Sequence, residues 1–190
     1  RDGSSQISPL NRWQNFYAVG AAWEVTKEDF MANQKVFDYL KVKASYGVLG
    51  VQNTFGYDYP YFPGLQTGNT AVFGNIVVPA YSLAYEPQRL LNWENVKSSE
   101  FGFEFVTLQN RLRVEAAYYH KLTRNIMNEV NLGAGRRRLD NIGSVVNQGL
   151  ELSATWTQKV NKDFDFSVSG NFTTFNNKVR SLGDRFPAGE

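Results

Sequence analysis

The chain has 190 residues, with 20 Lys and Arg against 18 Asp and Glu, a formal net charge of +2 and no cysteine. This nearly balanced charge gives no strong field to attract nucleic acid, and the lack of cysteine excludes disulfides and thiolate metal sites. Aromatic residues make up 15% of the chain, as in membrane barrels that line their interfaces with rings and in soluble sugar-binding β-proteins. There is no apolar run of about 18 residues, so no membrane helix is predicted.

The first part of the chain alternates between loop and strand patterns. Residues 1–11 are polar, lack the apolar segment of a signal peptide and are read as a loop. Residues 12–25 alternate between larger and smaller side chains and predict a strand. The alternation breaks over residues 26–40, where Thr26 is expected to cap a short helical turn. It returns over residues 40–50, with two lysines on the face opposite the apolar residues, so one face of this strand meets water.

Residues 51–97 form the longest irregular stretch and are punctuated by glycine and proline. Part of Val72–Tyr85 is expected to form an extra strand pair. The same stretch holds a cluster of aromatic residues, Tyr57, Tyr59, Tyr61 and Phe62. Loops of this length inside folded domains are usually functional or disordered.

Residues 97–131 and 150–172 each predict a long antiparallel hairpin, because their side chains alternate with a period of two. In both hairpins phenylalanine, leucine and valine fall on one face, and charged or hydroxyl side chains fall on the other. A second connector, residues 132–145, is expected between the hairpins. It carries three consecutive arginines, Arg136, Arg137 and Arg138.

Two environments produce strands with one apolar and one polar face. In a soluble sandwich the apolar face is the core, whereas in an outer-membrane barrel it meets lipid and the polar face meets a wet lumen. The tight turns at 107–110 and 159–163 fall at one end of the predicted sheet, and the long connectors 51–97 and 132–145 fall at the other. Outer-membrane barrels have short periplasmic turns and long outer loops. The sequence therefore favours an all-β chain of about six strands from a large antiparallel transmembrane β-barrel, with a soluble carbohydrate-binding β-sandwich as the alternative.

Several stretches, in the right order, resemble motifs of the SusC/RagA-type TonB-dependent transporters. These stretches are Leu40–Gln52, Leu91–Glu94, Ser99–Phe105, Asn110–Leu112, Tyr118–Lys121, Asn141–Ser144 and Asn147–Leu152. The resemblance implies a barrel of about 22 strands whose lumen is plugged by a separate domain. Residues 1–190 would be a single partial domain from the C-terminal half of that wall, with 51–97 and 132–145 as outer loops and the plug domain absent. The end of the chain, Arg185–Glu190, also lacks the terminal aromatic strand expected of a finished barrel.

The resemblance further implies where the protein lies and what it meets. It implies the cell outer membrane of a Gram-negative, Bacteroidetes-type cell, with outer-membrane lipid around the wall. A SusD-like surface lipoprotein would cap the mouth, and TonB would be reached through the missing N-terminal part. The expected function is nutrient import, with an oligosaccharide (glycan) or oligopeptide as substrate. The alternatives are the soluble sandwich and a passive outer-membrane barrel or adhesin.

No catalytic, cofactor-binding or metal-binding residues are predicted, and the chain is not expected to be an enzyme. The only histidine, His120, lies at a strand end and is read as part of a polar interface. Substrate or partner contacts are predicted for Tyr57, Tyr59, Tyr61, Phe62, Arg136, Arg137 and Arg138. For the tyrosines the alternative is packing within the loop, and for the arginines it is a solvated loop. An aromatic girdle at the periplasmic interface is predicted from Trp23, Phe105, Trp156 and Phe164, with a core stripe as the alternative.

Overall fold

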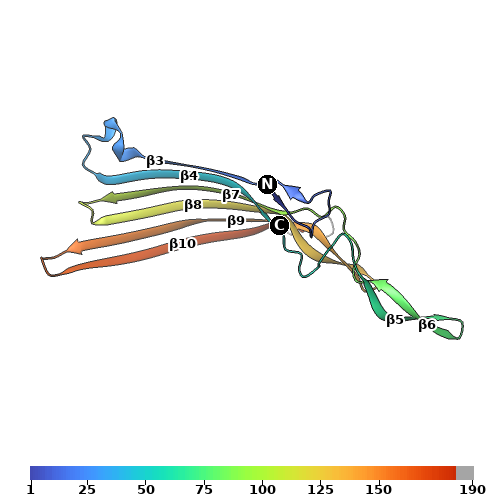
Figure 1. Ribbon diagram of the computed structural model, residues 1–190. Coiled ribbons are helices and arrows are strands. Elements are labelled where there is room, and N and C mark those ends of the chain that lie inside the picture. The colour runs from blue at the N-terminus through green and yellow to red at the C-terminus, as the bar shows by residue number, and fades with distance from the viewer. Residues whose placement is uncertain (183–190) are drawn as a thin grey trace.

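The fold is built on a single antiparallel sheet of six long strands, ordered β10-β9-β8-β7-β4-β3 (Figure 1). The computed structural model describes residues 1–182, so Arg185–Glu190, the basis for expecting an unfinished barrel, lies outside the described residues. The six strands are β3 (Tyr17–Glu24), β4 (Phe37–Val51), β7 (Glu94–Thr107), β8 (Leu112–Gly133), β9 (Arg136–Lys159) and β10 (Asp165–Ser181). The predicted all-β class and the count of about six wall strands are therefore confirmed.

Four further strands and two helical turns complete the described elements. β1 (Asp2–Gly3) pairs with β2 (Trp13–Gln14), and β5 (Leu65–Phe73) pairs with β6 (Ile76–Leu83). The 3-10 turns η1 (Val25–Lys27) and η2 (Asp29–Met31) connect β3 to β4. The prediction that Thr26 caps a turn is wrong. Thr26 lies within η1, and its hydroxyl instead accepts a hydrogen bond from the Leu40 N–H at 3.3 Å.

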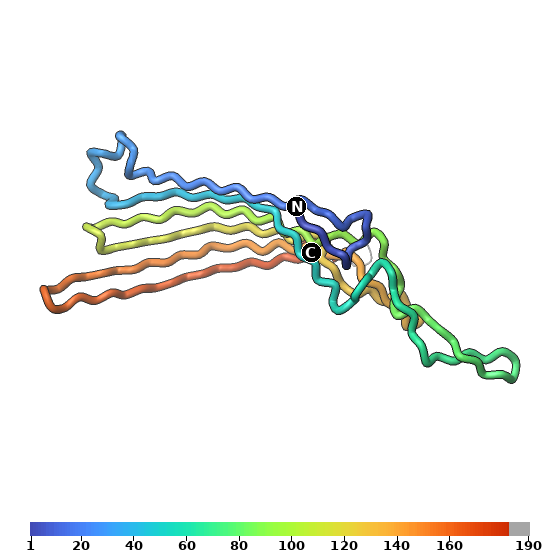
Figure 2. Tube along the Cα trace, in the orientation of Figure 1, coloured from blue at the N-terminus to red at the C-terminus, as the bar shows by residue number. Residues whose placement is uncertain are grey.

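The two ends of the sheet differ in their connections (Figure 2). One end, called the turn end below, carries the short β7–β8 and β9–β10 turns and the 3-10 connection between β3 and β4. The opposite end, called the loop end below, carries residues 1–16, residues 52–93 and the outer part of the β8–β9 hairpin. The β5–β6 hairpin projects from the loop end, away from the sheet.

The apolar face of the sheet is left open to its surroundings. Hydrogen-bonded partners form rows across the strands, and one such row joins Val42, Phe103, Ala116, Leu152 and Phe172. Large side chains of this face remain exposed, at 39% for Phe103, 42% for Leu152 and 62% for Phe172. Within residues 1–182 no second layer covers the face, so the described chain is not a sandwich. An open apolar face of this size belongs in lipid.

The opposite face is polar, and its charges pair between strands. The Lys43 ammonium on β4 lies 2.5 Å from Oε1 of Glu115 on β8, and Arg113 on β8 pairs with Glu104 on β7. Both pairs are diagonal to the hydrogen-bonded rows, because Glu104 stands opposite Glu115. A sheet with one charged and one apolar face fits a wall between water and lipid.

The main buried cluster lies at the loop end, where loop residues pack against the outer parts of β8 and β9. It consists of Ile7, Leu91, Trp93, Met127 and Leu139, each 5% exposed or less, with Phe16 packed against it. The ring of Phe16 meets Trp93 edge-on at 5.5 Å and also lies over Gly50, where a Cβ would be 1.9 Å from the ring. These contacts fasten the loops to the start of β7 and to the β8–β9 hairpin.

The prediction that residues 132–145 form a connector is wrong. β8 and β9 stay paired up to Gly133 and Arg136, and only Ala134 and Gly135 turn the chain, both with positive φ (52° and 73°). Two-residue turns of this kind match the twist of hairpin strands. The extra strand pair expected within Val72–Tyr85 is present, and it begins earlier, at Leu65.

Candidate functional site

The buried tyrosine of the aromatic cluster ties the long loop to the arginine hairpin. Tyr57 is 7% exposed, and its hydroxyl donates a hydrogen bond to Oε2 of Glu129 on β8 at 2.5 Å. The Arg137 guanidinium on β9 lies 3.5 Å from the same oxygen. The Tyr57 ring packs edge-on against Tyr85 at 4.4 Å. Loop 52–93 and the β8–β9 hairpin are thereby joined through one carboxylate.

Burial and this carboxylate together raise the pKa of Tyr57 to about 12. Burial is the larger cause, because it penalises the phenolate, and the hydrogen bond to Glu129 adds to it. Tyr57 is therefore a neutral hydrogen-bond donor at physiological pH. Its side chain supports the loop from inside, and its predicted role in substrate or partner contact stays a prediction.

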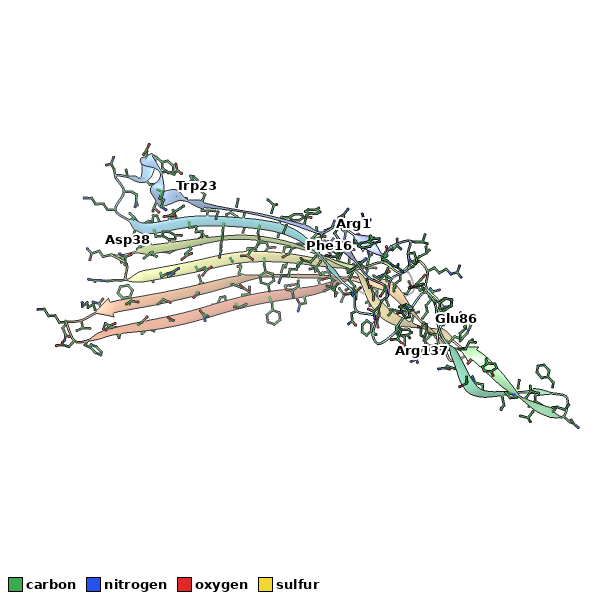
Figure 3. The ribbon with its side chains drawn as sticks, viewed as in Figure 1. Arg1, Phe16, Trp23, Asp38, Glu86 and Arg137 are labelled. Atoms are coloured by element: carbon green, nitrogen blue, oxygen red, sulfur yellow. The ribbon has the colours of Figure 1, made fainter. Side chains whose placement is uncertain are left out.

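The three arginines of the hairpin have neighbouring acidic partners. Arg136 lies 3.6 Å from Glu86, and Arg138 lies 2.5 Å from Asp140. The Glu86 N–H also donates to the Arg137 carbonyl at 2.8 Å, so Glu86 and Arg137 lie together at the loop end (Figure 3). The hairpin is therefore ion-paired, and the side chains of Arg136 and Arg137 remain more than half exposed.

The other aromatic residues of the cluster face outward to different degrees. Phe62 is 76% exposed and Tyr59 is 47% exposed. Tyr61 is half-buried, and its hydroxyl donates to the Ser5 carbonyl at 3.2 Å. Of the predicted contact residues, Tyr59, Phe62, Arg136 and Arg137 present surface at the loop end. Their role in binding stays a prediction.

An asparagine that was not singled out as a site residue joins three segments of the loop end. Asn141 on β9 accepts from the Asn92 N–H at 2.7 Å and donates to the Asn92 carbonyl at 2.9 Å. Its amide also donates to the carbonyl of Asn125 at 2.7 Å, where β8 has a positive φ of 56°. The sequence did contain a signal for this contact. Asn141 opens one of the stretches that resemble the SusC/RagA-type transporters, and Asn92 lies in another.

A half-buried glutamate starts β7 beside this clamp. Glu94 accepts a hydrogen bond from the Met127 N–H at 2.7 Å. Burial raises the pKa of Glu94, and the Met127 N–H opposes that rise. The carboxyl thus satisfies a donor where the ladder between β8 and β9 shifts register near Ile126 and Met127.

The polar face of the sheet, called the inward face below, has an open hollow near its middle. Lys43, Glu100, Glu115 and Glu151 line an open hollow of about 330 Å³, floored in part by Ala117. Within residues 1–182 no three His, Cys, Asp or Glu side chains are grouped to hold a metal ion. None of the helical segments in this part of the chain has the length and apolar character to cross a membrane.

The four predicted girdle residues step in one direction across the sheet. Each of them can be assigned a position on β9 by following its row of paired residues across the sheet. Trp23 is in the row of Leu152, and Phe105 is in the row of Ala154. Trp156 is itself on β9, and Phe164 corresponds to a position just past Lys159. Strands tilted by about 40° and spaced about 4.8 Å apart must shift by about 1.2 residues per strand to stay at one depth. Over the five steps from β3 to β10 the expected drift is about six residues, and the observed drift, from Leu152 to just past Lys159, is in the same direction and about eight. The girdle assignment stays a prediction. It requires a drift in this direction from strand to strand.

The comparisons with known proteins agree with this geometry. The family model described as "TonB dependent receptor-like, beta-barrel" matches residues 1–188. The chain is 30% identical over 191 residues to TonB-dependent receptor SusC of Bacteroides thetaiotaomicron, covering 95% of this chain and 18% of that protein. It is 29% identical over 185 residues to TonB-dependent receptor P26 of Formosa agariphila, covering 96% of this chain and 18% of that protein.

Solved structures resemble the chain over the same extent. The RagAB peptide importer in its "closed-closed" state superposes with a TM-score of 0.81 at 25% identity, covering 95% of this chain and 20% of that one. A second structure of the RagAB peptide transporter gives a TM-score of 0.79. The chain thus spans about a fifth of the length of these relatives. With a two-faced sheet and a family match over nearly its whole length, this chain belongs to the TonB dependent receptor-like β-barrel family and is a SusC/RagA-type segment of the barrel wall.

Proposed function

We propose that the chain forms wall and outer loops of an energy-coupled outer-membrane importer that takes up an oligopeptide or an oligosaccharide. The observation that carries this proposal is the division of one sheet into an open apolar face and an ion-paired polar face. Such a division is expected where a wall separates lipid from a water-filled lumen. The family match supports the proposal, since its named members are TonB-dependent receptors.

In this proposal the turn end faces the periplasm and the loop end faces outward. The long connections of outer-membrane barrels are extracellular, and the loop end carries residues 52–93 and the β8–β9 hairpin. Residues 1–190 act as one partial domain, while a plug and the contact with TonB belong to parts of the protein beyond it. A Gram-negative outer membrane of the Bacteroidetes type is the proposed location.

The proposed binding surface is formed by the exposed residues of the loop end. Tyr59 and Phe62 offer ring faces for stacking on a sugar or a side chain, and Arg136 and Arg137 offer donors for carboxylates. A SusD-like surface lipoprotein is the proposed lid over this surface. No covalent step is required of any residue, because import needs binding and release only.

Uptake by cells that express the full-length protein tests this function. Cells with the gene intact should accumulate a labelled oligopeptide or oligosaccharide, and cells lacking the gene or TonB should not. Uptake that persists without TonB would indicate a passive barrel. Equal accumulation with and without the gene, for both substrate classes, would overturn the importer assignment. Separate growth on peptide and on glycan then decides between the two classes.

A further inference from the structure

On strands β7 to β10, the apolar face of the sheet, called the outward face here, carries charged side chains of one sign only, and these lie near one end. From the turn end up to Arg124 the outward positions of β7, β8, β9 and β10 contain no Asp or Glu. The cations on this face, Lys97, Arg124 and Lys178, are all near the loop end, and Arg180 lies beside them. The carboxylates of the same strands, such as Glu100 and Glu151, occupy inward positions.

The two arginines among these cations, Arg124 and Arg180, border one hollow. Arg124 on β8 pairs with Ser144 on β9, and Ser144 pairs with β10 next to the bulge that contains Arg180. The two arginines therefore flank β9 from strands about 9.6 Å apart. Arg124 and Arg180 line an open hollow of about 420 Å³, together with Leu122, Ile142, Gly143 and Ser144 among others. This arrangement leaves room for a group held between two guanidinium ions.

The cations are not neutralised by the described part of the chain. Lys97, Arg124, Lys178 and Arg180 are exposed, and none forms an ion pair with a carboxylate of residues 1–182. Two carboxylates of the β8–β9 hairpin are paired with other arginines, Glu129 with Arg137 and Asp140 with Arg138. Unpaired arginines in this geometry suit an anion with several oxygens, because guanidinium binds phosphate through two parallel hydrogen bonds.

The depth of the hollow identifies the source of that anion. Depth is measured from Trp156, one of the predicted residues of the periplasmic girdle. Leu112 on β8 stands opposite Trp156, and Arg124 lies twelve residues further along β8. Twelve residues of strand rise about 41 Å, and a tilt of about 40° leaves about 31 Å across the membrane. A hydrocarbon core is about 30 Å thick, so Arg124 stands at the headgroup level of the outer leaflet. The outward face meets lipid at this level and not the lumen.

We infer that Arg124 and Arg180, assisted by Lys178, form a binding site for the phosphate group of a phosphorylated glycolipid in the outer leaflet. The inference rests on the proposed outer-membrane location. The acyl chains of such a lipid would lie along the exposed apolar side chains of the same face, of which Leu150 and Phe172 are 53% and 62% exposed. The site would anchor the lipid against the wall at its loop end.

The test uses the full-length protein in detergent and follows its thermal unfolding. Lipid A with its phosphate should raise the midpoint, whereas the same lipid after enzymatic dephosphorylation and inorganic phosphate alone should not. The double variant Arg124→Gln/Arg180→Gln should bind the phosphorylated lipid at least about 25-fold more weakly, at about fivefold for each cation. The double variant Arg124→Lys/Arg180→Lys keeps the charge and loses the paired hydrogen bonds. Its affinity for the phosphorylated lipid should lie between that of the wild type and that of the Gln double variant.

A charge-matched control and an import assay separate the outcomes. Arg111→Gln/Lys159→Gln removes two cations from the turn end and should bind the lipid as the wild type does, while heat-modifiable migration shows that each variant folds. Equal stabilisation by both lipids, an equal effect of inorganic phosphate, or an equal loss in the control would overturn the inference. Import is measured in parallel. Selective lipid binding by a protein that imports nothing would overturn the proposed function and leave this site standing.

Discussion

The six-stranded sheet and the loop end hold their apolar side chains in opposite ways. In the sheet, large residues such as Phe101 and Leu150 are more than half exposed, at 56% and 53%. At the loop end, Leu91 and Met127 are buried to 1% and 0%. The sheet is therefore stabilised by its ladders and by an apolar solvent, whereas the loop end is stabilised by a core of the kind found in water-soluble domains.

This contrast indicates that the sheet is adapted to lipid and the loop end to water. Lipid tails are as apolar as leucine, so an apolar residue on the outward face gains little from contact with its neighbours. A residue in the loop-end core gains the full transfer from water and close packing. The same type of substitution should therefore have unequal effects in the two regions, and the following predictions use that inequality.

The largest effect is expected from removing a ring of the loop-end core. Trp93→Ala deletes a side chain that is 5% exposed and that donates to the Arg12 carbonyl at 3.2 Å. The cavity and lost burial should cost about 3–5 kcal/mol of local stability. Limited proteolysis of the full-length protein should then cut within residues 1–16 or 84–93, while the barrel keeps its heat-modifiable migration. The matched variant Phe103→Ala, on the lipid face, should leave the protease pattern unchanged. Equal sensitivity in both variants would contradict the contrast.

The next effect concerns the two faces of one strand. Leu152→Lys places a charge on the outward face and should cost about 2–4 kcal/mol if that face meets lipid. Ser153→Lys, one residue later, places the same charge on the inward face opposite Glu115, where it gains a partner. The amount of folded protein in outer-membrane fractions should fall for the first variant only. A fall for Ser153→Lys alone would reverse the assignment of the faces.

The sequence predicted the sheet well and the loop end poorly, for a physical reason. Alternation with a period of two is local, so β7, β9 and β10 are visible in their own residues. The loop end is defined by pairs distant in the chain, such as Tyr57 with Glu129 and Asn92 with Asn141, which no local pattern encodes. Glycines and adjacent charges made residues 132–145 resemble a connector, although the ladder continues through them.

A smaller effect is expected from the asparagine clamp. Asn141→Ala removes the acceptor of the Asn92 N–H and the donor to two carbonyls. Leaving part-buried groups unsatisfied should cost about 1–3 kcal/mol, confined to the loop end. Hydrogen exchange should quicken at Asn92 and its neighbours and stay unchanged in the middle of β9. Asn171→Ala, on the exposed inward face of β10, provides the control and should change neither region.

The smallest effect is expected at Tyr57, and it depends on pH. At neutral pH, Tyr57→Phe loses the hydrogen bond to Glu129 and should lower loop-end stability by about 1 kcal/mol. Because the pKa of Tyr57 is raised to about 12 from an unfolded value near 10, the folded loop end favours the neutral phenol. That contribution is fully present below about pH 10 and is lost as the pH rises toward 12.

The wild type should therefore lose loop-end stability between about pH 10 and 12, and Tyr57→Phe should show a shallower decline over the same interval. Hydrogen exchange is too fast to follow there, so protection against a protease active in alkali is the measurement. Tyr59→Phe is the matched control, because it removes a hydroxyl from a tyrosine ring that is 47% exposed. Parallel declines in wild type and Tyr57→Phe would show that the Tyr57 hydroxyl is not held by Glu129. The loop end would then depend on its apolar core and on its other hydrogen bonds, such as those of Asn141.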